Sequence, residues 1–165
     1  VSHTAYRTRE LSRTFADKGF GEDERRYWEE DAAWQGFREL MERALTVWDW
    51  GEAIVVLSLV VKPAVEEAVL RRLGEAARHN GDTLLGLITD AQLIDAARHR
   101  RWTAAFVAMA METPGNLELI KGWIAKWEPL ADRAIEAYCG ALPDVPNAAA
   151  AAKAATRDLR RGAGL

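Results

Sequence analysis

The chain has 165 residues, 49% of them hydrophobic and 28% charged, and its 22 basic and 25 acidic residues give a formal net charge of −3. A chain of this length can bury a hydrophobic core as one domain. The slightly acidic balance argues against nucleic acid as a partner, because binding to phosphates requires an excess of Lys and Arg. The seven tryptophans are many for a chain of this size.

Cysteine content and hydropathy exclude two further classes of protein. The single cysteine, Cys139, cannot form an internal disulfide, and no zinc-ligand spacing is present, which indicates a reducing compartment. The longest apolar run, Ala53–Val61, is interrupted by Ser58 and is too short to cross a membrane. The sequence also opens without a secretory signal. We therefore expect a cytoplasmic protein that binds no membrane.

The sequence divides into three parts. Residues 1–22 show no helical or strand period, so we expect an arm or linker there, or a frayed end. Residues 23–142 have apolar side chains at three- and four-residue steps and should form the folded domain. Residues 143–165 form an alanine-rich tail that begins between prolines and whose composition favours a helix.

Start and stop signals predict four helices within residues 23–142. Pro63 and Pro129 fall inside two of them and should kink these helices without ending them. The predicted helices are Asp23–Val47, Asp49–His79, Thr83–Glu112 and Leu117–Leu142. Because the Asn80–Asp82 turn is short, the helices on either side of it must run antiparallel. The fold predicted is an all-α, ferritin-like bundle of long antiparallel helices.

The segment Asp49–Lys62 has no polar face. At about 100° per residue, its apolar side chains point in nearly every direction. A helix of this kind must be buried all round. The other helices of this chain could enclose it, or another polypeptide could cover part of its surface. The many tryptophans favour the second interpretation, because Trp is enriched at protein interfaces.

The sequence offers no ligand set for an internal di-iron site and no catalytic residue. Bundles that hold two irons use Glu-x-x-His pairs, but the residues three positions before His79 and His99 are Ala76 and Ala96. Cys139 has no histidine near it in sequence, and no glycine-rich phosphate loop is present. We therefore expect a bundle without metal or cofactor.

Asp95 and Arg98 are charged residues within an apolar stripe of the predicted helix Thr83–Glu112. Charges at such positions are rare unless they are paired. They could form an ordinary ion pair on a partly exposed stretch. Our hypothesis is that they belong to a buried ion-pair network, in the space where a catalytic relative would place metal ligands. Asp95→Ala should then cost several kcal/mol of stability.

Three well-separated segments resemble one known family. The first is Asp49–Ala53 with Leu59–Pro63, the second is Gly74–Asp82 with Arg100–Ala104, and the third is Trp123–Asp132. Together they are similar to the β subunit of the hydroxylase of soluble di-iron multicomponent monooxygenases, which oxidise methane, phenol, toluene, alkenes and propane. The resemblance extends from about Trp28 to Leu142 and corresponds to the C-terminal half of such a subunit.

The resemblance implies a structural role. Family β subunits are similar in fold to the iron-bearing α subunit but lack its metal ligands, and they pack against it in an α2β2 or α2β2γ2 hydroxylase. The di-iron centre and the oxidation of hydrocarbon by O2 belong to the α subunit. Electrons come from NAD(P)H through a separate reductase, and a small regulatory protein tunes the reaction. Trp48, Trp50 and Trp102 are the candidate contacts with partners, and burial in the core is the alternative for each.

Other classes of function remain open at this stage. One alternative is a free-standing helical adaptor or ligand-binding bundle without an enzymatic role. Another is a stand-alone di-iron oxidase with irregular ligands, which metal analysis would reveal. A helical transcription factor is disfavoured by the net charge.

Overall fold

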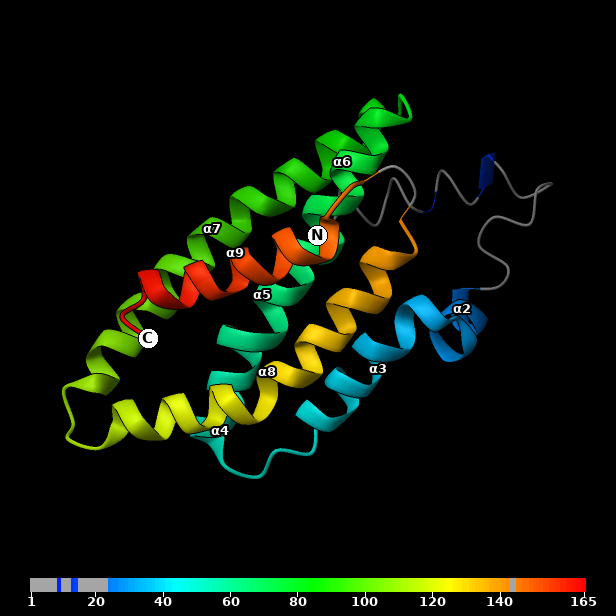
Figure 1. Ribbon diagram of the computed structural model, residues 1–165. Helices are drawn as coiled ribbons and strands as arrows, with labels where there is room; N and C mark the ends of the chain where they lie inside the picture. Colours follow the sequence, from blue (N-terminus) through cyan, green and yellow to red (C-terminus); the bar gives the residue numbers. More distant parts are fainter. Residues whose placement is uncertain (1–8, 10–12, 15–23, 143–144) are drawn as a thin grey trace.

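The computed structural model describes residues 9, 13–14, 24–142 and 145–165, which form a bundle of long helices (Figure 1). These residues contain no β-strand. The helices are α2 (Glu24–Glu30), α3 (Ala32–Ala44), α4 (Trp50–Val55), η2 (Val56–Val61), α5 (Lys62–Ala64), η3 (Val65–Arg71), α6 (Arg72–His79), α7 (Thr83–Met111), α8 (Asn116–Gly140) and α9 (Ala148–Gly162). The all-α architecture predicted from the sequence is confirmed. The expected arm at 1–22 lies outside the described residues, except for positions 9 and 13–14.

Aspartate caps fix where three helices begin. The carboxylates of Asp31, Asp49 and Asp82 accept hydrogen bonds from backbone N–H groups in the first turns of α3, α4 and α7. The prediction of one helix over Asp23–Val47 is wrong in one respect. Asp31 has an extended backbone (ψ 127°), which separates α2 from α3.

The central helix runs continuously from Trp50 to His79 through α4, η2, α5, η3 and α6. Pro63 lies inside it, as predicted, but the stretches on both sides of the proline are π-helical. The N–H of Lys62, for example, donates to the carbonyl of Leu57, five residues earlier. Such wide turns were not predicted from the sequence, although they are a known way for a helix to accommodate an interruption.

The short turn at Asn80–Asp82 reverses the chain, so that α7 returns antiparallel to α6, as predicted (Figure 1). Gly81 in this turn has φ +78°, a backbone conformation that favours glycine. Gly74 of α6 lies directly against Thr89 of α7, so the two helices approach closely. The turn and Gly74 together allow α6 and α7 to pack side by side.

The core lies between α3, α8 and the central helix. Phe37, Leu40, Val56, Val60 and Ile135 are almost completely buried there. In the apolar segment that starts at Asp49, Trp50 and Leu57 stay exposed, whereas five side chains are buried in this core: Val55, Val56, Leu59, Val60 and Val61. Enclosure by the residues that the structure describes is therefore incomplete, and cover by another polypeptide stays a prediction.

The alanine-rich helix α9 packs against α8, α5 and η3. Its buried residues recur every four positions and are Ala148, Ala152, Thr156 and Arg160. The two alanines and the threonine allow a close approach to the bundle, and Arg160 pairs with Glu128 of α8. Within the described part of the chain, no helix combines the length and apolar character required to cross a membrane.

Candidate partner-binding surface

The connection between α3 and α4 exposes large apolar side chains at one end of the bundle. Trp48 is fully exposed (102% of its reference area), and Trp50 at the start of α4 is 73% exposed. Leu45 in the same connection is also exposed. Single exposed apolar residues are ordinary, but several that lie together indicate an interaction site.

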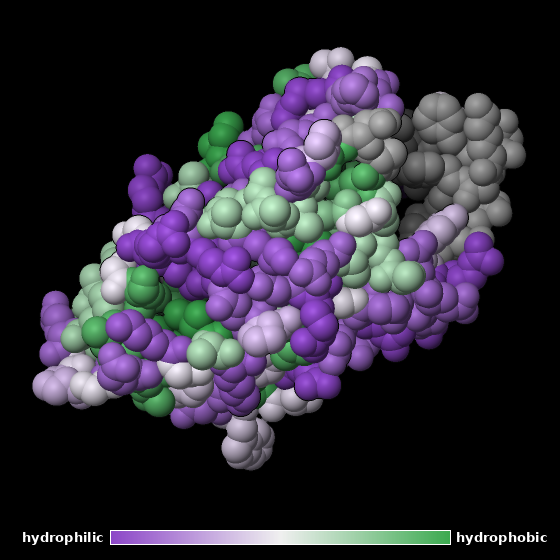
Figure 2. Space-filling model, viewed as in Figure 1, coloured by the Kyte–Doolittle hydropathy of each residue, from purple (hydrophilic) through white to green (hydrophobic). Residues whose placement is uncertain are grey.

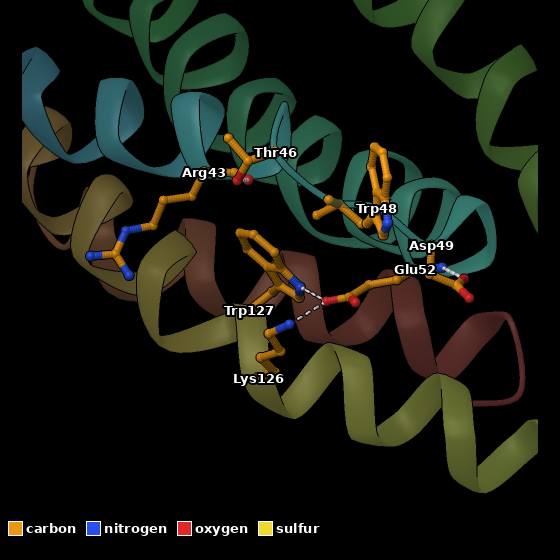
Figure 3. Close-up of a pocket in the computed structure, with 8 residues that line it drawn as sticks. Arg43, Thr46, Trp48, Asp49, Glu52, Lys126 and Trp127 are labelled. Carbon is orange, nitrogen blue, oxygen red and sulfur yellow. Dashed lines mark hydrogen bonds and ion pairs between the residues drawn. The ribbon is translucent and has the colours of Figure 1, made fainter.

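A cleft of about 730 Å³ opens beside these residues, between the α3–α4 connection and α8 (Figure 3). It is lined by Arg43, Thr46, Val47, Trp48, Asp49, Glu52, Lys126 and Trp127. Tryptophan and arginine are enriched at protein interfaces, and polar side chains are common at the rim of such surfaces.

Glu52 joins the two walls of this cleft. Its Oε1 accepts hydrogen bonds from Nε1 of Trp127, at 2.6 Å, and from Nζ of Lys126, at 2.7 Å (Figure 3). These two hydrogen bonds hold the pKa of Glu52 below its ordinary value. The Lys126 ammonium also lies 5.4 Å from the centre of the Trp127 ring, a cation–π distance. The carboxylate therefore remains charged at neutral pH and fixes α4 against α8.

Two of the segments that carry the family resemblance meet at this place. Asp49–Ala53 begins the central helix, and Trp123–Asp132 lies on α8. Gly51 lets the two segments approach, because a Cβ atom there would lie 3.2 Å from the Trp123 ring. The first and last of the resembling segments thus form one contact between two helices.

A second polar cluster is buried inside the bundle. Glu66 and Glu67 of η3 are only 3% and 2% exposed. Arg100 of α7 donates to both carboxylates, at 2.7 Å to Glu66 and 2.8 Å to Glu67, and Arg71 binds Glu67 at 2.6 Å. Burial raises the pKa of Glu67, but the two arginines outweigh it and the net shift is downward. This cluster was not predicted from the sequence.

The hypothesis that Asp95 and Arg98 form a buried network in this chain is wrong. The two side chains do form an ion pair, at 2.6 Å, but they are 64% and 70% exposed. The apolar stripe to which they belong faces outward, because α6 and η3 cover the opposite face of α7. The buried network lies at Glu66 and Glu67 instead. The available signal was the pair of adjacent glutamates within the otherwise apolar stretch Pro63–Leu70.

The third predicted contact residue, Trp102, is 60% exposed on α7 and stacks on Phe106, with ring centroids 5.6 Å apart. Whether Trp48, Trp50 and Trp102 contact a partner stays a prediction. The Nδ1 of His99 lies 2.5 Å from Nζ of Lys62, a lysine rather than a carboxylate. Among the described residues, no group of three or more His, Cys, Asp or Glu side chains could hold a metal ion.

The fold and this surface define a helical bundle whose exposed aromatic residues and cleft suit assembly with another protein. A family described as Methane/Phenol/Alkene Hydroxylase matches residues 1–114. The chain belongs to this family.

The relatives make the resemblance more specific. The chain is 56% identical over 142 residues to the toluene-4-monooxygenase hydroxylase subunit beta of Ectopseudomonas mendocina, covering 86% of this chain and 43% of the relative. It is 28% identical over 123 residues to the phenol 2-monooxygenase oxygenase component DmpL of Pseudomonas sp. (strain CF600). This match covers 72% of this chain and 37% of the relative.

A solved structure of toluene 4-monooxygenase with toluene in its resting active site matches with a TM-score of 0.81 and 57% identity, over 86% of this chain and 47% of that chain. The resemblance to hydroxylase β subunits is thus confirmed. The chain spans less than half the length of each of these relatives.

Proposed function

We propose that this chain is part of the non-catalytic β subunit of a soluble di-iron monooxygenase hydroxylase and that it packs against the α subunit. The observation that carries this proposal is the exposure of Trp48, which lines the cleft, and of Trp50, two residues further along the chain. Large aromatic side chains at the centre of an interface commonly supply most of its binding energy.

The proposal assigns the chemistry to other chains. The di-iron centre lies on the α subunit, which oxidises a hydrocarbon with O2, and the electrons come from NAD(P)H through the reductase. A regulatory protein acts on the complex, which has the composition α2β2 or α2β2γ2 and lies in the cytoplasm. This chain, as the C-terminal half of its subunit, supplies no catalytic residue.

The contact between α4 and α8 gives this surface its rigidity. Glu52 holds the first turn of α4 against Trp127, so Trp50 projects from an ordered helix. A rigid anchor loses little conformational entropy when it becomes buried, which favours binding. The residues of the family motifs therefore position the exposed tryptophans rather than perform chemistry.

The test is co-expression of this chain with the α subunit of the Ectopseudomonas mendocina toluene-4-monooxygenase hydroxylase, followed by co-purification. We expect the parent chain to bind and the double variant Trp48→Ala, Trp50→Ala to lose at least about 2 kcal/mol of binding free energy. The matched control is Leu119→Ala, which removes an exposed apolar side chain from α8. It should bind like the parent.

Two outcomes would overturn the proposal. A stable, cooperatively folding monomer that does not bind the α subunit would favour a free-standing adaptor. About two irons per purified chain would favour a stand-alone oxidase.

A further inference from the structure

Helix α7 has two apolar faces. One face packs inside the bundle, and its buried residues are Gly86, Thr89, Ala96, Thr103 and Val107. The opposite face is exposed, yet it also presents apolar side chains. We call this outer face the α7 seam, which consists of Leu84, Leu87, Ala91, Ile94, Arg98, Trp102, Ala105 and Met109.

The α7 seam has the spacing of a helix-packing surface. Its members follow one another at steps of three or four residues, and at about 100° per residue they fall within an arc of about 80°. The arc runs from Leu84 to Met109, which corresponds to about 38 Å of helix. An exposed helix face is normally polar, whereas a stripe of this kind packs along a second helix.

The surroundings of α7 leave this stripe uncovered. α7 lies along one outer edge of the molecule (Figure 1), and hydrophobic side chains are visible at that edge (Figure 2). Leu87, Ile94, Trp102 and Met109 are all exposed. No other described helix lies over them, because the contacts of α7 are with α6, η3, η2 and α8 on its inner side.

The one charged member of the α7 seam already has a partner. Arg98 lies near the middle of the stripe and binds Asp95 at its border, at 2.6 Å. An unpaired charge would make this face costly to cover, but a charge that enters an interface with its counter-ion costs much less. The ion pair is thus compatible with burial of the α7 seam.

We propose that the α7 seam packs against a long amphipathic helix from the part of the hydroxylase β subunit that has no counterpart in this chain. This chain covers 43% of the Ectopseudomonas mendocina β subunit and 47% of the matching solved chain, so more than half of each relative is available to supply it. Long antiparallel helices in such bundles pack side by side through stripes of this kind. The inference rests on family membership and not on contact with the α subunit.

The test is co-expression of the tagged 165-residue chain with the Ectopseudomonas mendocina β-subunit polypeptide that lies outside the 142-residue match. We expect the two polypeptides to co-purify, and amide hydrogen exchange along 84–109 to slow in the complex. Ile94→Glu should weaken the complex about 100-fold, because it places an unpaired carboxylate in the α7 seam. Leu119→Glu makes the same kind of change at an exposed site on α8 and should leave the complex unchanged.

The ion pair provides a second comparison. Asp95→Asn should leave the melting temperature of the isolated chain unchanged but weaken the complex about 100-fold, because Arg98 would become buried without its partner. The matched control is Asp158→Asn, which breaks an exposed i,i+3 pair with Arg161 on α9 and should not affect the complex.

Three results would overturn the proposal. The first is failure of the two polypeptides to co-purify, and the second is equal binding by the parent and by Ile94→Glu. The third is protection of 84–109 by a second copy of this chain or by the α subunit alone. Loss of α-subunit binding on mutation of Trp48 and Trp50 concerns a different surface, so the two proposals can fail separately.

Discussion

Trp127 on α8 donates its indole Nε1–H to Oε1 of Glu52, in the first turn of α4, at 2.6 Å (Figure 3). Lys126 binds the same oxygen at 2.7 Å. Glu52 and Trp127 are 75 residues apart in sequence, and each belongs to a segment that resembles the hydroxylase family. One carboxylate oxygen therefore connects the helix that bears Trp50 to the helix that lines the other side of the cleft.

Glu52→Gln should destabilise the chain by about 1–2 kcal/mol at pH 7, because the amide loses the charge-assisted bonds to Lys126 and Trp127. The pKa of Glu52 is lowered in the folded state, so its contribution is present above the unfolded pKa and is lost as the pH falls through the folded pKa. When urea unfolding is measured from pH 7 down to pH 3, the free energies of unfolding of the parent and the variant should become equal in acid.

Glu118→Gln is the control for this change. It removes a carboxylate that is 80% exposed and lies 3.6 Å from Lys121, and it should change stability by less than about 0.5 kcal/mol. If the free energies of unfolding of the parent and of Glu52→Gln differed by the same amount at every pH, the charge of Glu52 would not be what stabilises the chain.

Arg100→Met should destabilise the chain by about 3–5 kcal/mol, because it leaves Glu66 and Glu67 buried with fewer counter-charges. Arg98→Met removes an arginine two residues away on the same helix, but its pair with Asp95 is exposed and should contribute at most about 1 kcal/mol. Chemical unfolding of both variants measures the difference. Equal losses would contradict the assignment of the buried network to Glu66 and Glu67.

The course of the chain could largely be predicted from its caps and turns. Asp82 and Gly115 lie where α7 and α8 begin, and each is a residue whose chemistry favours such a position. The break at Asp31 could not be predicted, because the apolar spacing continues across it. The π-helical turns around Pro63 were also missed, because a proline indicates an interruption but not how the neighbouring backbone adapts.

The candidate surface was harder to predict. Periodicity placed Asp95 and Arg98 in an apolar stripe, but α7 has such stripes on both sides, and only its packing against α6 decides which one is inside. The buried cluster depends on Arg100 and Glu67, which are 33 residues apart and come together only because the chain reverses at Gly81. Exposure of Trp48 likewise follows from the path of the α3–α4 connection.

Gly36→Ala should destabilise the chain by about 1–3 kcal/mol, because the new Cβ atom would lie 2.6 Å from the Cα atom of Ala134 and force α3 away from α8. Gly122→Ala is the matched change on the open side of α8, where a Cβ atom meets nothing within 4 Å. It should stabilise the chain by about 0.5–1 kcal/mol, since glycine is the weaker helix former. Thermal unfolding distinguishes the two, and a stabilising Gly36→Ala would contradict the close approach of α3 and α8.

Cys139 should react slowly with a thiol reagent in the folded chain. Burial raises the pKa of its thiol, and the nearby positive charge of Arg72 offsets this only in part. Because the thiolate is the reactive form, the native rate should increase with pH around a midpoint above the ordinary thiol value, and at pH 8 it should be at least about tenfold below the rate in guanidinium chloride. Cys139 is the one cysteine of the sequence, so all of the absorbance change that accompanies reaction with a chromogenic thiol reagent comes from this residue. Equal rates in the native and unfolded states would show that the end of α8 opens readily and that this thiol is not held in the core.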